Sequence, residues 1–153
     1  MSNGEIAQSG DPQSEEDIKA VEAKISRAVP ATYRKFLLDH NGGHPEPADF
    51  HFADSKEDGG IVAAFFGVNV SGTMNLEDTL RTYADRIPTR MFPIAHDPGG
   101  NLILLVVSGK DKNKIYFWDH EEEAEEGEPP TEDNLTLISN SFTAFLNSLD
   151  NLW

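Results

Sequence analysis

The sequence "MFPIAHDPGGNLILLVVSGKDKNKIYFWDH", Met91 to His120, contains three apolar runs that are each of strand length. The first two runs are separated by Asp-Pro-Gly-Gly and the last two by Ser-Gly-Lys-Asp-Lys-Asn, and both links have turn chemistry. Strands with such short links run antiparallel, because a parallel pair needs a crossover of a dozen or more residues. The stretch therefore predicts an antiparallel meander.

Two helices are predicted before this meander. The first begins after Ser14, which can act as N-cap, and Asp17 stands three residues later, as in a capping box. The second starts at Pro30, where the missing N–H costs nothing. It ends at Asn-Gly-Gly, residues 41–43, since Asn and Gly accept the left-handed conformation at a helix C-terminus.

Two more helices are predicted later in the chain. One begins after Asn75, the expected N-cap, and is ended by Pro88. The last has apolar residues at helical spacing over residues 142–149, with Ser139 or Asn140 as its N-cap.

Strands are also expected between the second and third helices, at "DFHFAD" and at the apolar run "GIVAAFFGVNV". Helices and hairpin-linked strands are thus segregated along the chain. This order predicts an α+β domain, with a mainly antiparallel sheet and helices packed against it.

Length and composition indicate one domain in a reducing compartment. A chain of 153 residues suits a single core, and the absence of cysteine excludes disulfides, cysteine-based zinc sites and cysteine nucleophiles. The start of the chain lacks the basic and apolar regions of a signal peptide, and no apolar run reaches the ~20 residues of a membrane span. We expect a cytoplasmic protein with a flexible lead-in over residues 1–13 and a domain over 14–153.

The charge is concentrated at one end of the sequence. The chain has 12 basic and 27 acidic residues, a net charge of −15, and no Lys or Arg follows Lys114, whereas ten acids do. Residues 121–133, "EEEAEEGEPPTED", are predicted to be a loop, because like charges repel and two prolines disrupt regular structure. We call them the acidic loop. Such a charge repels nucleic acid and anionic membranes and attracts basic partners, although acidity can also serve solubility alone.

Candidate catalytic chemistry is limited to two Asp/His pairs at strand ends, His96-Asp97 and Asp119-His120. If their strands pair, these four residues could approach one another as a metal or general-base site, which is one hypothesis for an enzyme. However, adjacent residues on a strand point to opposite faces, which favours strand-end turn residues instead. The acidic loop lacks the spacing of an EF-hand, and no serine has a nucleophile-elbow context.

The aromatic run Tyr116, Phe117 and Trp118 directly precedes the acids. Core packing is the ordinary explanation for such a strand. The alternative is that Trp118 lies at the rim beside the acids, where a tryptophan makes a good interface anchor.

Four motifs occur in order along the chain: "VPATYRKFLLDHNGGHP", "MFPIAHDPGGNLILLVV", "KIYFWDHEEE" and "SFTAFLNSL". Together they resemble the SMI1/KNR4 family, also called the SUKH superfamily, over about Ser14 to Leu149. The acidic loop is longer and more acidic than the family pattern requires. The residues that carry the resemblance are Val29, Pro30, Tyr33, Phe36, Leu37, Asn41, Gly42, Gly43, Pro93, Ile94, Ala95, Asp97, Gly99, Gly100, Asn101, Tyr116 to His120, Ser141, Phe142, Phe145 and Leu146.

The resemblance implies a single α+β domain without enzymatic activity and without a cofactor. Bacterial members look like immunity proteins of polymorphic toxin and contact-dependent systems, which bind a cognate toxin, often a nuclease, in the cytoplasm. Fungal members look like signalling scaffolds of cell-wall synthesis. We therefore expect an immunity protein, with a regulatory or scaffold interaction module without a toxin partner as the alternative.

The expected partner is a toxin protein with a basic surface, and neither nucleic acid nor a membrane is expected to bind. No catalytic, metal-binding or cofactor-binding residue is assigned. The candidate partner-binding residues are Trp118, Asp119, Glu121, Glu122, Glu123, Glu125 and Glu126.

Overall fold

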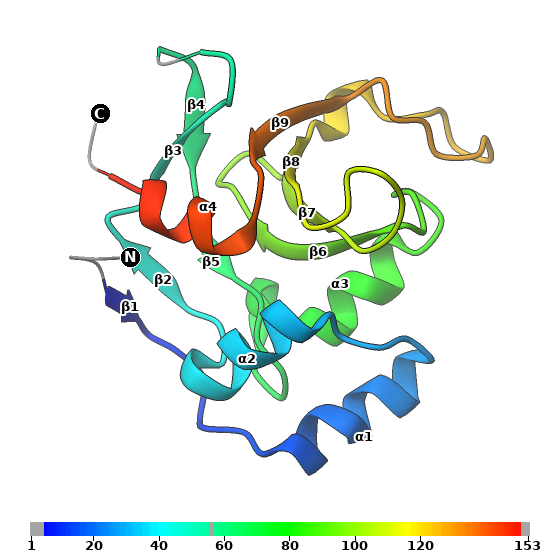
Figure 1. Cartoon of the computed structure of the whole chain (residues 1–153). Coiled ribbons are helices and arrows are strands. Elements are labelled where there is room, and N and C mark those ends of the chain that lie inside the picture. The colour runs from blue at the N-terminus through cyan, green and yellow to red at the C-terminus, as the bar shows by residue number, and fades with distance from the viewer. Residues whose placement is uncertain (1–4, 56, 151–153) are drawn as a thin grey trace.

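The computed structural model describes residues 5–55 and 57–150, and Figure 1 shows its helices and strands. The strands are β1 (Glu5–Ala7), β2 (His44–Glu46), β3 (Asp49–His51), β4 (Gly59–Ile61), β5 (Ala64–Phe65), β6 (Met91–His96), β7 (Leu102–Val106), β8 (Ile115–Trp118) and β9 (Leu135–Ser139). The helices are α1 (Glu15–Ile25), α2 (Ala31–His40), α3 (Leu76–Tyr83) and α4 (Phe142–Ser148), with the 3-10 helices η1 (Gly72–Met74) and η2 (His120–Glu122).

The central sheet has the strand order β5-β6-β7-β8-β9, and every neighbouring pair is antiparallel. The predicted meander is therefore confirmed as β6, β7 and β8. The link between β6 and β7 is tight because the carboxylate of Asp97 accepts the backbone N–H groups of Gly99 and Asn101 at 2.9 and 2.8 Å. Gly100 has a φ of 89°, a left-handed conformation that glycine adopts without strain.

The helices pack against this sheet and against one another, which confirms the α+β fold class. The α1 helix contacts α3, α3 contacts β6, and α4 contacts both β9 and β3. The capping box of α1 is present as predicted: the Ser14 side chain accepts the N–H of Asp17, and the Asp17 carboxylate accepts the N–H of Ser14. Asn75 caps α3 as predicted, but α4 is capped by Ser141 rather than by Ser139 or Asn140, because β9 continues through Ser139.

The beginning of the chain differs from the prediction. Residues 5–7 form β1, which pairs with β2, and the N–H of Gly10 donates to the carbonyl of Asn41 at 3.0 Å. Residues 5–7 and Gly10 thus form backbone hydrogen bonds with the domain, although they fall within the expected lead-in over residues 1–13. A three-residue polar strand such as "EIA" carries too little hydrophobic pattern to be recognised in the sequence.

The apolar run at residues 60–70 also differs from the prediction of a single strand. It contributes to two strands, and each strand belongs to a different sheet. Its first part, β4, pairs with β3 in a two-stranded sheet, while β5 pairs with β6 in the central sheet. The chain changes sheets at Val62 and Ala63, whose N–H groups donate to Ala48 and His96 respectively. Hydrophobicity alone does not indicate such a change of sheet.

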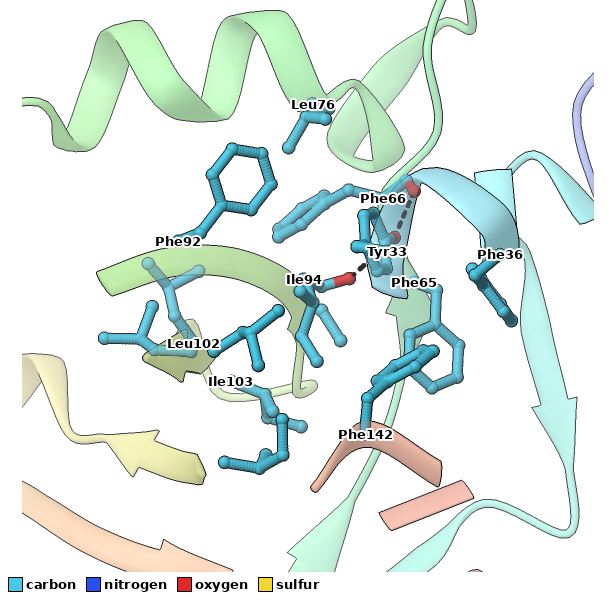
Figure 2. Close-up of a cluster of buried hydrophobic side chains, with 14 of the residues drawn as sticks. Tyr33, Phe36, Phe65, Phe66, Leu76, Phe92, Ile94, Leu102, Ile103 and Phe142 are labelled. Carbon is cyan, nitrogen blue, oxygen red and sulfur yellow. Dashed lines mark hydrogen bonds between the residues drawn. The ribbon is translucent and has the colours of Figure 1, made fainter. Parts of the chain in front are cut away.

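The core is built around aromatic side chains from α2, β5, β6 and α4, as Figure 2 shows. Tyr33 of α2 is fully buried and stacks against Phe36 at a ring distance of 5.5 Å. Its hydroxyl lies within hydrogen-bonding distance of two backbone carbonyls, those of Phe66 and Ile94. Burial raises the pKa of Tyr33 well above its ordinary value, so the hydroxyl stays protonated and can donate.

The turn after α2 explains the Asn-Gly-Gly sequence. Asn41 is 1% exposed and has a φ of 34°, and its side chain accepts the N–H of Val68 and donates to the carbonyls of Val68 and Asp11. Gly42 has a φ of 76°, and a Cβ there would lie 2.8 Å from backbone atoms of the following sheet segment. The motif therefore fastens the end of α2 to the chain after β5.

Candidate functional site

The acidic loop leaves the central sheet after β8 and returns to it at β9, as Figure 1 shows in yellow to orange. Its first residues belong to η2, and the rest has no helix or strand. Most of its acids are exposed. Those that form no ion pair with any described residue are Glu121, Glu122, Glu125, Glu126, Glu128 and Asp133.

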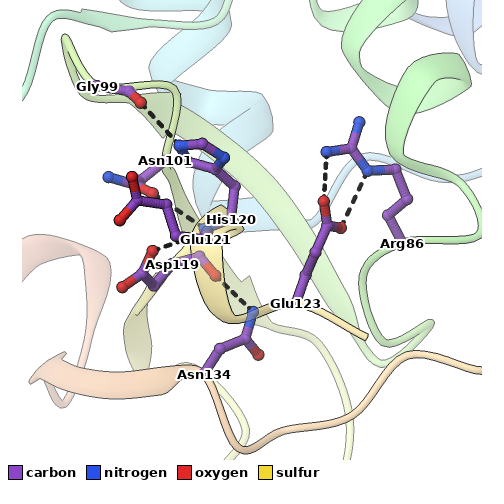
Figure 3. Close-up of polar contacts among 8 residues, drawn as sticks. All are labelled: Arg86, Gly99, Asn101, Asp119, His120, Glu121, Glu123 and Asn134. Atoms are coloured by element: carbon purple, nitrogen blue, oxygen red, sulfur yellow. Dashed lines mark hydrogen bonds and ion pairs between the residues drawn. The ribbon is translucent and has the colours of Figure 1, made fainter. Parts of the chain in front are cut away.

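Glu123 is the exception near the start of the loop. Both of its carboxylate oxygens accept hydrogen bonds from Arg86, at 3.0 Å from Nε and 2.7 Å from Nη2 (Figure 3). The guanidinium lies 4.3 Å from the ring centroid of Tyr83 and 5.9 Å from that of Trp118. The hydrogen bond that Arg86 donates to Glu123 raises the pKa of Arg86.

Glu132 is the corresponding exception near the end of the loop. It accepts two hydrogen bonds from Arg90, one of them at 2.8 Å from Nε, and the same guanidinium donates to Asp111 at 2.6 Å. The hydrogen bond from Arg90 lowers the pKa of Glu132, and likewise that of Asp111. The loop is thus attached at both ends to arginines that lie between α3 and β6.

A cleft of about 960 Å³ lies between the acidic loop and the chain that follows α3. One wall consists of loop residues 123–130, and the other consists of residues from Arg81 to Thr89. The cleft is lined by the acids Glu125, Glu126 and Glu128 together with apolar residues from both walls, such as Ile87 and Pro129. This combination of acids and apolar surface suits the long stem and charged head of a lysine or arginine side chain.

The Asp119-His120 pair holds a turn and forms no shared site. The carboxylate of Asp119 accepts the N–H of Glu121 at 2.9 Å, which caps η2. The backbone N–H of His120 donates to the side-chain carbonyl of Asn101 at 3.0 Å, and its Nε2 lies 3.0 Å from the carbonyl oxygen of Gly99 (Figure 3). His120 therefore fastens the start of the acidic loop to the β6–β7 turn, whereas Asp119 holds the first turn of the loop itself.

The His96-Asp97 pair also has structural contacts. His96 lies against the ring of Phe66, with 5.6 Å between centroids, and Asp97 uses both oxygens within its own turn, to Gly99 and Asn101. Among residues 5–55 and 57–150, no group of three or more His, Asp or Glu side chains is arranged to hold a metal ion. The structure therefore gives no support to the hypothesis of a metal-dependent enzyme at these four residues.

Trp118 lies in the core, which is the ordinary explanation for its strand, and not at the rim as the alternative of an interface anchor supposed. Its side chain is 0% exposed, and its ring meets that of Tyr83 edge to face, at a centroid distance of 5.6 Å. Strand alternation correctly placed Trp118 opposite Phe117, but it did not show that the end of α3 covers that face. Its contribution to the acidic loop is indirect, through Arg86.

Arg86 and Arg90 are the residues of this region that sequence reasoning missed. They lie 37 and 42 residues from their acidic partners, so no local spacing connects them. Glu128 also lines the cleft and was not included in the candidate set. The sequence offered one indication of these contacts. Only 12 basic residues are present beside 27 acids, so each arginine has many possible acidic partners.

Within the part of the chain that the structure describes, no helix has the length and apolar character needed to cross a membrane. A family model described as "SMI1 / KNR4 family (SUKH-1)" matches residues 12–148. The chain is also 30% identical over 150 residues to the SPbeta prophage-derived uncharacterized protein YokK of Bacillus subtilis (strain 168), an alignment that covers 88% of this chain and 73% of the relative.

Proposed function

Because this chain belongs to the SMI1/KNR4 family (SUKH-1), which supports an immunity-protein-like role, we propose that it neutralises a cognate bacterial toxin by binding it directly. The proposed activity is non-enzymatic, and the toxin is one with a basic surface, such as a nuclease. The observation that carries the proposal is the row of exposed, unpaired carboxylates on the acidic loop.

The physical argument is electrostatic. A nuclease must neutralise phosphates and therefore carries lysines and arginines where its substrate binds. An acidic protein that covers this surface competes with the substrate, and opposite charges steer the two proteins together faster than neutral surfaces would meet. A chain with a net charge of −15 and ten acids after its last lysine has this property.

The proposed binding surface differs in part from the candidate residues of the sequence. Asp119 and Glu123 bind within the chain, and Trp118 is buried, so none of the three is offered freely to a partner. The carboxylates proposed to meet the toxin are Glu121, Glu122, Glu125, Glu126 and Glu128.

The test compares two triple variants with the same change of net charge. The first replaces Glu125, Glu126 and Glu128 with Gln. The control replaces three exposed acids far from the loop in sequence, with the changes Glu16→Gln, Asp54→Asn and Glu57→Gln. The rate of association with the toxin encoded by the neighbouring gene is measured at low and at high salt.

We expect the loop variant to associate about tenfold more slowly at low salt and the difference to shrink at high salt, while the control changes little. Equal association rates for the two variants would contradict the proposed surface. If the neighbouring product does not bind the wild-type chain at all, the result would contradict the toxin partner and favour the regulatory or scaffold alternative.

A further inference from the structure

We propose that the acidic loop is a strap closed over the cleft by two arginine latches, and that loss of the latches opens it. The strap is residues 123–132, and the latches are Arg86 on Glu123 and Arg90 on Glu132. The inference concerns the free protein and does not depend on the identity of any toxin.

The latches hold the two ends of the strap from one short segment. Arg86 and Arg90 are four residues apart and flank Pro88, between the end of α3 and the start of β6. Both arginines stand on fixed backbone: the N–H of Arg86 donates to Tyr83 at 2.9 Å, and the carbonyl of Arg90 accepts the N–H of Val107 at 2.8 Å. The strap therefore spans a gap between two points that belong to the rigid body of the domain.

Each latch is stronger than an ordinary surface ion pair because of its geometry. Both arginines bind their carboxylates with two hydrogen bonds each, which is the favoured fork arrangement. The Arg86 guanidinium is further fixed against the rings of Tyr83 and Trp118. The Arg90 guanidinium is further fixed by Asp111, in the turn between β7 and β8.

Between the latches, the strap has no other polar attachment. Residues 124–131 form no hydrogen bond or ion pair with any other part of the described chain. Their one internal backbone bond runs from the N–H of Glu128 to the carbonyl of Glu125 at 2.9 Å, across Gly127 with its φ of 87°. Two prolines, Pro129 and Pro130, restrict the returning half. The strap is therefore internally stiff, and the two latches decide where it lies.

The cleft depends on the same two contacts. It is bounded on one side by strap residues and on the other by the segment that carries the arginines. When both latches are broken, the strap is free to move away as a unit, and the separation of the two walls is no longer fixed. The latches thus also fix the positions of Glu125, Glu126 and Glu128 relative to the domain.

A spin label on the strap can report this attachment. The chain contains no cysteine, so a single Glu126→Cys substitution places a nitroxide at one exposed position without further changes. The label is attached to the full chain with wild-type latches, to Arg86→Gln/Arg90→Gln, and to Arg81→Gln. Arg81 is a matched control, because it lines the same cleft but pairs with Glu77 inside α3.

We expect a slow electron paramagnetic resonance spectrum for the wild-type latches and for Arg81→Gln, and a fast spectrum for the double variant. In the unlabelled chains, which keep Glu126, cleavage by a glutamyl endopeptidase after Glu125 or Glu126 should be about tenfold faster in the double variant. A fast spectrum with intact latches, or equal spectra and cleavage rates for the double variant and Arg81→Gln, would overturn the proposal.

A salt series on the labelled chain with intact latches keeps the proposal testable if the double variant does not fold. Raising salt from about 0.1 M to about 1 M shortens the screening length from about 10 Å to about 3 Å, which weakens partly exposed ion pairs. The mobile fraction of the label should rise across this range. A spectrum that is mobile throughout, or one that salt leaves unchanged, would contradict electrostatic latching.

Discussion

At the scale of single residues, Tyr33 has the most demanding position in the core. Its hydroxyl serves two carbonyls on different segments, and no water can reach it because the side chain is fully buried. A buried carbonyl that loses its donor bears the full cost of desolvation. Tyr33 therefore links α2 to β6 by a polar contact inside an apolar cluster.

We predict that Tyr33→Phe lowers the free energy of unfolding by about 1–3 kcal/mol, because the carbonyl of Phe66 loses its hydrogen bond in the core. Urea denaturation measures this change. Tyr116→Phe is the control, since that hydroxyl is 3.3 Å from Asp111 in a partly exposed position. Equal effects of the two substitutions would show that the Tyr33 hydroxyl has no special role.

Arginine is required at both latch positions for a reason of shape. The guanidinium presents parallel N–H groups that match a carboxylate, and its flat face stacks on aromatic rings. Lysine at position 86 would keep the charge, but it would lose the second hydrogen bond to Glu123 and the stacking on Tyr83. A charge-conserving substitution is therefore not a neutral one at this position.

At the scale of elements, the attachment of the strap depends on pH. The hydrogen bond from Arg90 lowers the folded-state pKa of Glu132 from its ordinary value of 4.5, and that of Asp111 from 3.8. A group with a lowered folded-state pKa stabilises the fold fully above its unfolded-state pKa. That contribution is lost as the pH falls through the folded-state pKa.

We therefore predict that Arg90→Gln costs about 1 kcal/mol of stability at neutral pH, a modest value because Glu132 is half exposed. The difference from wild type should stay constant down to about pH 5 and shrink as the pH falls below the ordinary carboxylate pKa values of ~4. Unfolding free energies of both proteins between pH 7 and pH 3 test this expectation. Arg81→Gln removes the same charge, so a similar profile for that variant would assign the effect to net charge instead.

The sequence predicted the elements whose borders are marked by specific residues. The meander, the capping box of α1 and the cap of α3 all have turn or capping chemistry at their ends. The strands β1 and β9 were missed because they lack such marks. In β9, four of the five residues are only partly buried, so its hydrophobic pattern is weak although it pairs along the whole of β8.

Only the acidic residues of the candidate site could be predicted from the sequence, because charge follows directly from residue type. The acids of the loop could be read directly, and four of the seven candidate residues are exposed acids without an ion pair. The latches could not be read, because they join residues that come together only when α3 packs against β6. The sequence left the rim position of Trp118 open as an alternative, because the residue that covers it, Tyr83, belongs to α3.

At the scale of the whole molecule, negative charge is present in large excess. Only 12 basic residues oppose 27 acids, so most carboxylates cannot each be balanced by a basic residue of their own. The resulting self-repulsion lowers the stability of a compact state, and dissolved salt screens it. The local latches and the global repulsion therefore respond to salt in opposite directions.

We predict that the melting temperature of the wild-type chain rises between about 0.02 M and about 0.2 M salt, because screening of the repulsion outweighs the weakening of a few ion pairs. The variant with Gln at positions 125, 126 and 128 should show a smaller rise, since it carries three fewer negative charges. Thermal unfolding followed by circular dichroism provides the measurement. A fall in the wild-type melting temperature would mean that ion pairs dominate.

The attachment of the strap by its two ends has a consequence for divergence between related proteins. The eight residues between Glu123 and Glu132 form no bond that the folded domain needs, whereas the latches lie in the body of the domain. Substitutions in that interval can alter recognition without a penalty in folding, so new specificities can be explored one mutation at a time. When the surface of a partner changes, substitutions in this short segment can thus restore binding while the rest of the domain stays unchanged.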